Sequence, residues 1–322
     1  MVVKVFVTGA SGFLGSVVVE TAARAGHEVL ALVRPKAAAS IPTRPGVRVV
    51  PGDLRQAGSW RDALAEADAV IHCAASFGDL PTQLAGTVLT TENLLSALTP
   101  RTRRFVHVSS LSVYDFDAPR RLLDENTPLE AKVRRRDAYT ETKLLQEQLV
   151  RTYASQRGLE LVVARPGAIY GPGKDWDAGR ALRVGRLDVI FAPLTPMRLT
   201  HVENCATALV RALDVPLDGS LIVNIIDGEQ PTHWRYHRLA RDAGATTGIP
   251  VPVPYLAVKA LGWSARLASK MFFGGRARLP ELLDPPRQRV RWRPLRYSAD
   301  LARSALDWRP RVNLKEGVKT LR

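Results

Sequence analysis

Short apolar runs alternate with amphipathic stretches along most of this chain. The apolar runs predict strands at 2–7, 28–33, 47–50, 69–74, 104–108, 160–164 and 221–225. Apolar positions three and four residues apart predict helices at 13–25, 59–66, 83–98, 138–157 and 203–213. Strands alternating with helices are typical of a parallel sheet covered on both faces. We therefore expect an α/β fold with a doubly wound parallel sheet.

The alternation breaks in the second half of the chain. Proline and glycine become frequent between 167 and 196, and again at 250–254 and 280–294. We expect these stretches to build a smaller, discontinuous C-terminal lobe over the carboxyl ends of the strands. Open α/β sheets bind their ligands at that edge.

The first predicted strand runs into a turn rich in glycine, Thr8-Gly9-Ala10-Ser11-Gly12-Phe13-Leu14-Gly15. Glycines at these spacings permit a sharp turn and close helix packing, and the free N–H groups of a helix start attract an anion. The pyrophosphate of a dinucleotide fits this arrangement. The first gap is one residue longer than in the G-x-G-x-x-G fingerprint. The alternative is that the glycines serve tight packing alone.

The second predicted strand ends without an acidic residue. Glu28 to Val33 is followed by Arg34, Pro35 and Lys36. An Asp or Glu at this place usually holds the free 2′-hydroxyl of an NAD ribose, whereas a guanidinium pairs with the 2′-phosphate of NADP. We therefore expect NADP(H) to be favoured over NAD(H). The alternative is that Arg34 is a solvated loop residue in an arginine-rich chain.

Two further strand ends carry candidate nucleotide contacts. Asp53 and Leu54 follow the third strand, where a carboxylate can accept a hydrogen bond from the adenine amino group. Ala74 and Ala75 follow the fourth strand, and such small residues leave room for a nucleotide against the backbone. Neither feature is specific by itself.

Hydroxyl, phenol and ammonium groups occur where the fifth strand ends and the next helix begins. The strand ends in Ser109 and Ser110, and the helix at 138–157 carries Tyr139 and Lys143. Residues four apart lie on one helical face, so the phenol and the ammonium share a side. A Tyr-x-x-x-Lys pair alone is a weak signal.

In their order and spacing, these motifs resemble the extended branch of the short-chain dehydrogenase/reductase superfamily, often called the NAD-dependent epimerase/dehydratase family. The resemblance covers most of the chain. It rests on Thr8 to Gly15, Asp53, Ser109 to Tyr114, Tyr139 with Lys143, Arg165 to Gly173, and His201 to Asn204. It implies a Rossmann fold, a nicotinamide dinucleotide cofactor and an oxidoreductase centre.

The resemblance also implies a role for each site residue. Tyr139 would exchange a proton with a carbonyl or alcohol oxygen that Ser110 holds, while Lys143 lowers the pKa of Tyr139 and binds the nicotinamide ribose. Ser109 is expected to be structural. The expected cofactor-binding residues are Thr8, Gly9, Ser11, Gly12, Phe13, Leu14, Gly15, Arg34, Asp53, Leu54, Ala74, Ala75, Tyr139, Lys143 and Pro166. No metal ligand is expected.

Departures from the family pattern narrow the expected reaction. Leu111 and Ser112 stand where the dehydratases resemble one another in carrying Asp-Glu, which disfavours elimination of water. Epimerases of the branch usually carry an acidic residue where Arg34 stands.

The second half of the chain gives the expected substrate. Asn224 to Thr232 and the apolar region 250–273 resemble 3β-hydroxysteroid dehydrogenase-like and dihydroflavonol reductase-like members. We expect a reductase or dehydrogenase of a small, largely apolar carbonyl or secondary alcohol. One alternative is a nucleotide-sugar epimerase or dehydratase, and another is a non-catalytic dinucleotide-binding sensor. A diphosphate sugar would need cations, which could come from Lys174, Arg180, Arg183 and Arg186.

The expected domain division and partners follow from the same resemblance. Residues 1–170, with 199–226 returning to them, form the NADP-binding domain, and 171–198 with 227–322 form the substrate-binding lobe. Helices at 83–98 and 138–157 form dimer faces in many relatives, so we expect a homodimer. The segment 255–273 has a helical period, and we expect a helix packed in the lobe in preference to a membrane-surface helix.

Composition excludes several other classes. The 322 residues are 46% hydrophobic and 24% charged, as in ordinary globular proteins. The net charge of +15 comes from scattered arginines without alternating aromatics, so we expect no nucleic-acid partner. Cys73 and Cys205 lack CxxC spacing, which disfavours a zinc site or a disulfide framework. No leader or membrane-spanning run is evident, so we expect a cytoplasmic protein.

Overall fold

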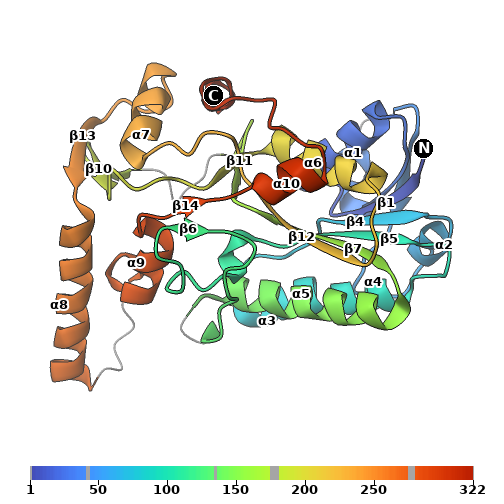
Figure 1. Ribbon diagram of the computed structural model, residues 1–322, viewed down its shortest axis with the longest axis horizontal. Coiled ribbons are helices and arrows are strands. Elements are labelled where there is room, and N and C mark those ends of the chain that lie inside the picture. Colours follow the sequence, from blue (N-terminus) through green and yellow to red (C-terminus); the bar gives the residue numbers. More distant parts are fainter. Residues whose placement is uncertain (1, 41–43, 134–135, 175–180, 275–279, 322) are drawn as a thin grey trace.

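The computed structural model describes residues 2–40, 44–133, 136–174, 181–274 and 280–321. Its centre is a seven-stranded parallel sheet in the order β12-β7-β5-β4-β1-β2-β3 (Figure 1). The strands are β1 (Lys4–Thr8), β2 (Glu28–Val33), β3 (Val47–Pro51), β4 (Ala69–His72), β5 (Arg104–Val108), β7 (Glu160–Pro166) and β12 (Ser220–Ile225). The strand order reverses between β1 and β4, and ligands of open α/β sheets bind at such a point.

The predicted doubly wound parallel sheet is confirmed. Each of the seven predicted strands forms, with boundaries that shift by up to two residues. β4 ends at His72, earlier than predicted, because the chain then turns out of the sheet. The N–H of Ala74 donates to Thr8 Oγ1 at 3.3 Å in place of a strand neighbour.

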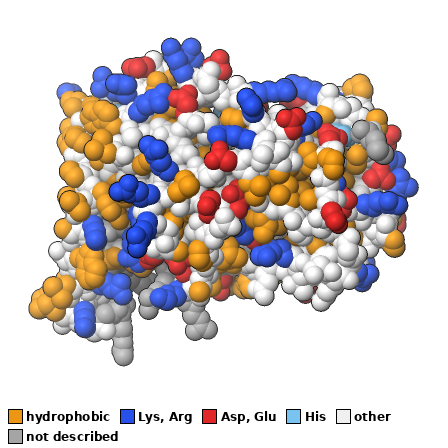
Figure 2. Space-filling model, viewed as in Figure 1, with side chains coloured by type: hydrophobic (Ala, Val, Ile, Leu, Met, Phe, Trp, Pro, Cys, Tyr) orange, Lys and Arg blue, Asp and Glu red, His pale blue; other side chains and the backbone are white. Residues whose placement is uncertain are grey.

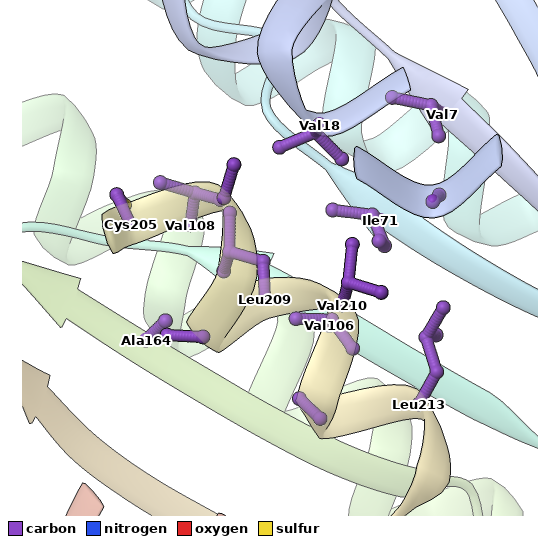
Figure 3. Packing of buried hydrophobic residues seen from close by; sticks show 14 of the residues in the cluster. Val7, Val18, Ile71, Val106, Val108, Ala164, Cys205, Leu209, Val210 and Leu213 are labelled. Carbon is purple, nitrogen blue, oxygen red and sulfur yellow. The ribbon is translucent and has the colours of Figure 1, made fainter. Parts of the chain in front are cut away.

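Helices cover both faces of this sheet (Figure 1). One face carries α1 (Phe13–Arg24), α6 (Val202–Asp214) and α10 (Asp300–Ala305), and the other carries α2 (Trp60–Ala65), α4 (Thr90–Ser96) and α5 (Ala138–Arg157). Successive strand residues point to opposite faces, so Val7 packs with the first group and Phe6 with the second. Figure 3 shows Val18 of α1 and Leu209 of α6 meeting Ile71 of the sheet. Both faces of the sheet are therefore buried under helices.

The predicted helix at 83–98 forms with an irregularity. α3 (Leu80–Gln83) continues through a π-helical turn, Leu84–Leu89, into α4. Such turns insert an extra residue per turn and often occur at functional sites. A Cβ on Gly86, within this turn, would lie 1.9 Å from the Ser76 hydroxyl oxygen. The glycine thus lets the loop after β4 pass close to the helix.

The remaining elements form a smaller, discontinuous lobe, which also includes short strands from segments that the predicted division gives to the cofactor domain. Its strands form one sheet in the order β13-β10-β9 and the pairs β11–β8 and β14–β6. These strands are β6 (Leu122–Leu123), β8 (Ala168–Tyr170), β9 (Leu182–Val184), β10 (Leu187–Phe191), β11 (Leu199–His201), β13 (Ile249–Val253) and β14 (Arg296–Tyr297). The helices are α7 (His233–Asp242), α8 (Tyr255–Phe273), α9 (Pro285–Trp292) and α11 (Leu314–Lys319).

Proline determines where β13 can lie. Pro250 and Pro252 fall within this strand, and β13 is at the edge of its sheet. Edge strands tolerate proline because one side of their backbone has no strand neighbour to receive an N–H. Pro254 then begins α8, which packs against α9 and the short turn Glu281–Leu283. α8 therefore packs on the lobe through one face, in agreement with the expectation of a packed helix.

Candidate active site

A cleft of about 1140 Å³ opens at the carboxyl edge of the sheet. The glycine turn, the ends of β2 to β5 and the start of α5 form its floor, and Val290 and Arg291 of α9 contribute from the lobe. Every residue predicted from the sequence to contact the cofactor or to act in catalysis lines this cleft, except Thr8. Tertiary structure thus brings together motifs that are spread over about half of the chain.

The glycine turn has both packing and binding features. Gly9 has a φ of +66°, and a Cβ there would lie 2.9 Å from the backbone nitrogen of Ala74. A Cβ on Gly15 would lie 2.1 Å from the carbonyl oxygen of Gly9, so the helix can approach the strand only with glycine. α1 starts after Gly12 without a side-chain cap, which leaves its first N–H groups directed at the cleft. A dinucleotide pyrophosphate fits this cradle.

Thr8 lies behind the glycine turn, where its side chain contacts other protein groups, and its contact with the cofactor stays a prediction. The Thr8 hydroxyl is fully buried and lies 2.7 Å from His72 Nδ1. The other ring nitrogen of His72 lies 2.8 Å from the Thr91 hydroxyl. Burial lowers the pKa of His72 to about 3, so the imidazole is neutral and serves this network.

Arg55 was not among the predicted nucleotide contacts, but it lines the cleft beside them. Arg55 donates from Nε to both Asp53 carboxylate oxygens, at 3.1 and 3.0 Å, and lines the cleft with Arg34. The hydrogen bond from Arg55 lowers the pKa of Asp53, and the charge of Arg34 lowers it further. This corner of the cleft therefore carries two guanidinium groups and one carboxylate.

The phenol of Tyr139 faces the cleft from the first turn of α5. Asp137 caps this helix by accepting from the Thr140 N–H at 2.8 Å, which fixes where the helix begins. The ring of Phe77 stacks on the Tyr139 ring. Burial raises the pKa of Tyr139, the Ser110 hydroxyl lowers it through a hydrogen bond, and the Asp137 carboxylate raises it again. The phenol is protonated at neutral pH.

Lys143 lies one turn further along α5 and is engaged within the protein. Its ammonium donates to the Val108 carbonyl and to Gln146 Oε1, both at 2.9 Å. Burial lowers the pKa of Lys143 to about 8. The expected lowering of the Tyr139 pKa by Lys143 is wrong for the protein alone, because burial dominates and the ammonium points to these other partners.

A buried ion pair supports the floor of the site. Glu147 accepts from the Ser109 hydroxyl at 2.6 Å and from Arg165 Nε at 3.1 Å, and the side chains of both charged residues are almost fully buried. The Arg165 guanidinium lies 4.6 Å from the ring centre of Tyr114. The Ser109 hydroxyl is therefore bonded within the protein, although Ser109 lines the cleft together with Ser110.

Of the expected diphosphate ligands that the structure describes, Lys174 lines the cleft. Lys174 Nζ lies 5.2 Å from the ring centre of Phe13 and 5.7 Å from that of Phe77. Arg183, expected as a diphosphate ligand, pairs instead with Asp188 and does not line the cleft. Arg186 does not line the cleft either. Arg180 lies outside the described residues.

Comparisons with known proteins agree with this geometry. The model of the NAD dependent epimerase/dehydratase family matches residues 5–225. A 4-hydroxy-2-methyl-3-oxo-4-farnesyl-3,4-dihydroquinoline-1-oxide ketoreductase from Stigmatella aurantiaca is 28% identical over 99% of this chain and 96% of its own. A 3-beta-hydroxysteroid dehydrogenase from Mycolicibacterium neoaurum is 28% identical over 70% of this chain and 59% of its own.

The fold is also similar to solved structures. The UDP-glucuronic acid 4-epimerase from Bacillus cereus, solved in complex with NAD, has a TM-score of 0.73 at 18% identity and covers 99% of this chain and 97% of its own. At this identity the likeness concerns the fold alone. It agrees with the Rossmann-like sheet described above.

Proposed function

Since this chain belongs to the NAD-dependent epimerase/dehydratase family, we propose that it is an NADP(H)-dependent reductase or dehydrogenase of a small, largely apolar carbonyl or secondary alcohol. One observation carries the proposal: Ser110, Tyr139 and Lys143 line the same cleft as the glycine turn. A hydroxyl, a phenol and an ammonium beside a dinucleotide cradle are the groups that reversible reduction of a carbonyl requires.

The protonation of Tyr139 favours the reductive direction. Its raised pKa keeps the phenol protonated at neutral pH, so the side chain can donate a proton to a carbonyl oxygen. In this proposal Ser110 holds that oxygen, and Lys143 binds the ribose next to the nicotinamide. When bound, the nicotinamide supplies or accepts the hydride.

Arg34 and Arg55 support a preference for NADP. Arg55 already neutralises the Asp53 carboxylate, so the charge of Arg34 remains for a 2′-phosphate. Arg34 itself is exposed at the edge of the cleft, where a guanidinium can pair with a phosphate through two hydrogen bonds. A free 2′-hydroxyl would find no unpaired carboxylate among these three residues.

The Phe77 ring over Tyr139 supports an apolar substrate. Phe77 stacks on the Tyr139 ring, and Phe13 also lines the cleft. The farnesyl-dihydroquinoline ketoreductase and the 3-beta-hydroxysteroid dehydrogenase, both named for apolar substrates, are relatives of this chain. Leu111 and Ser112, in place of an acidic pair, disfavour dehydration.

A nucleotide-sugar substrate is the second candidate function. Lys174 and Arg291 line the substrate side of the cleft, and cations at that place could bind a diphosphate. The two candidates differ in a measurable way, because an apolar substrate needs no anion site in the lobe.

The decisive experiment incubates the protein with NADPH or NADH and panels of steroids, alkyl ketones, flavonoids and nucleotide sugars, and follows absorbance at the nicotinamide band. Net oxidation of NADPH with an apolar ketone supports the proposal. Conversion of a nucleotide sugar without net cofactor consumption indicates an epimerase. Tight binding of NADPH without turnover of any panel member would indicate a sensor. Calorimetry with a nucleoside diphosphate at saturating NADP tests the second candidate directly.

We also propose a homodimer built on the helices that follow β4 and on α5. Leu84, Leu89 and Leu145 are exposed on these helices, which lie side by side. Apolar side chains on two neighbouring helices are suited to a symmetric interface with the same helices of a second copy. Light scattering after size exclusion tests this, with Leu89→Asp and Leu145→Asp expected to yield monomers.

The proposed domain division, 1–170 with 199–226 against 171–198 with 227–322, can be tested by limited proteolysis.

A further inference from the structure

The helix α8 has two unlike faces. Its inner face is made of small or short residues, and Val258, Gly262 and Ser269 are buried. A Cβ on Gly262 would lie 2.4 Å from the side chain of Gln288 in α9, so the two helices approach closely only at glycine. Gln288 Nε2 donates to the Val258 carbonyl at 2.9 Å. α8 thus packs against α9 through small side chains, and its large side chains are exposed.

The outer face of α8 is apolar and exposed. Leu256 is 76% exposed, Trp263 is 60% exposed and Phe272 is 75% exposed. Leu256, Trp263 and Leu267 are spaced seven and four residues apart, so they form one stripe along the helix. Figure 2 shows hydrophobic side chains along the edge of the molecule that α8 occupies in Figure 1. A soluble monomer rarely exposes a continuous patch of this kind.

Positive charge accompanies this apolar stripe. Lys259, Arg266 and Lys270 are exposed on α8, and the sequence of the helix contains no Asp or Glu. At 3.6 residues per turn the three cations lie together, between the buried face and the apolar stripe. None of them forms an ion pair with another residue of the described chain. An apolar stripe flanked by unpaired cations matches the interface of an anionic lipid bilayer.

We infer that α8 lies on the surface of an anionic lipid membrane, with Leu256, Trp263 and Leu267 in the acyl boundary and its cations at the headgroups. A second copy of this chain fits less well, because it would bring three more cations and no acids from the same helix. No helix among the described residues is long and apolar enough to cross a membrane, so the contact is parallel to the surface.

This surface adjoins the wall of the cleft. α8 packs on α9, and Val290 and Arg291 of α9 line the cleft that holds Tyr139. A membrane-bound protein would therefore take an apolar substrate from the lipid next to its own cleft. This consequence rests on the proposed function, whereas docking of α8 does not.

Vesicle sedimentation tests the docking without any substrate. The unmodified protein should sediment with vesicles of phosphatidylcholine and phosphatidylglycerol, and much less with phosphatidylcholine alone. The variant Leu256→Ser/Trp263→Ser/Leu267→Ser should lose this binding. Lys259→Gln/Arg266→Gln/Lys270→Gln should weaken it about 10²-fold and reduce its salt dependence. Leu301→Ser, on the exposed side of α10, is the matched control and should bind normally.

Binding of NADPH and far-ultraviolet circular dichroism verify that each variant is folded. Emission from Trp263 should shift to the blue on anionic vesicles, and Trp263→Phe should remove that shift. Absence of sedimentation with anionic vesicles would overturn the inference. So would equal sedimentation of the apolar variant, or self-association of the unmodified protein that the apolar variant abolishes in the absence of lipid. A protein that binds vesicles but oxidises no NADPH would refute the proposed function and leave the docking in place.

Discussion

The ring of Phe77 lies parallel to the ring of Tyr139, with centroids 5.6 Å apart and 11° between the planes. Phe77 is 68% exposed, so it covers the phenol from the solvent side of the cleft. In the proposed function, an apolar substrate at the Tyr139 hydroxyl would lie next to this ring. The contact links substrate affinity to a residue with no chemical role of its own.

Replacing Phe77 is expected to affect KM more than kcat. Phe77→Ala removes apolar surface worth about 1.5–3 kcal/mol when buried against a ligand, so KM for an apolar ketone should rise roughly 10-fold to 150-fold. NADPH affinity should change little. Phe77→Leu keeps most of the apolar surface and serves as the control. Steady-state kinetics with both variants check this, and a large loss of kcat at unchanged KM would contradict it.

Removing the guanidinium of Arg34 should reduce the preference for NADPH. Arg34→Ala is expected to weaken NADPH binding by about 1.5–3 kcal/mol and NADH binding very little, because the lost group pairs with the 2′-phosphate. Lys36→Ala removes a nearby exposed charge that does not line the cleft and is the matched control. Titration of nicotinamide fluorescence measures the affinities of the unmodified protein and both variants for NADPH and NADH. Equal affinities for NADPH and NADH in the unmodified protein would contradict the assignment.

Tyr139→Phe removes the proposed proton donor without changing the shape of the site. Turnover should fall by about 10²–10⁴-fold, while NADPH still binds. The Phe77 stack does not need the hydroxyl, so the ring is expected to stay in place. Ser109→Ala, which removes a hydroxyl bonded to Glu147, is the comparison for Ser110→Ala. Only the Ser110 variant should lose turnover at unchanged stability; turnover at the normal rate in Tyr139→Phe would refute the role.

Cofactor binding should depend on pH through Lys143. Burial lowers the pKa of this ammonium to about 8 in the folded protein, so it is charged below pH 8 and neutral above it. The anionic cofactor should therefore bind best below pH 8, with Kd rising by up to about tenfold per pH unit above it. The contribution of Lys143 to the free energy of unfolding has the opposite trend. It rises between pH 8 and about 10.4, because over this range the lysine of the unfolded chain still binds its proton while that of the folded protein does not. Lys143→Ala should bind weakly at every pH, and an unchanged pH profile in it would contradict the prediction.

Breaking the buried ion pair should destabilise the whole sheet. Glu147→Gln leaves the Arg165 guanidinium buried without its carboxylate, which costs about 3–5 kcal/mol in the free energy of unfolding. Asp307→Asn breaks the pair with Arg211 at the surface, where Asp307 is almost fully exposed, and should cost less than about 1 kcal/mol. Urea denaturation compares the two variants. Similar losses from both would show that the buried pair has no special role.

Many site residues could be identified from the sequence because their signals are local. A glycine turn after Val7, an arginine after Val33 and a tyrosine four residues before Lys143 are each visible within one element. Local motifs of this kind fix backbone conformation and helix face, and their order along the chain fixes the strand ends at which they meet. The structure accordingly brings Gly9, Arg34 and Tyr139 to one cleft.

Residues that act through long-range contacts carried no such signal. Phe77 is an ordinary loop residue until the chain folds and places its ring centre 5.7 Å from Lys174 Nζ. Arg55 follows Asp53 by two residues, and that spacing could have identified it as the partner of the carboxylate. The pKa of Tyr139 also depended on tertiary structure, since burial outweighs the neighbouring charges.

The sequence by itself determined the parallel sheet, the glycine cradle and the chemical groups of the site, because apolar period and turn chemistry act over a few neighbouring residues. Only the tertiary structure decided which face of α8 is buried. The segment 255–273 has apolar residues on most sides of the helix. The spacing of these residues therefore could not distinguish the face that contacts α9 from the face that is exposed to solvent. Close approach at Gly262 selected the small side chains for the interior and left Trp263 outside. Burial of an apolar side chain requires a partner surface, and that surface comes from residues distant in the sequence.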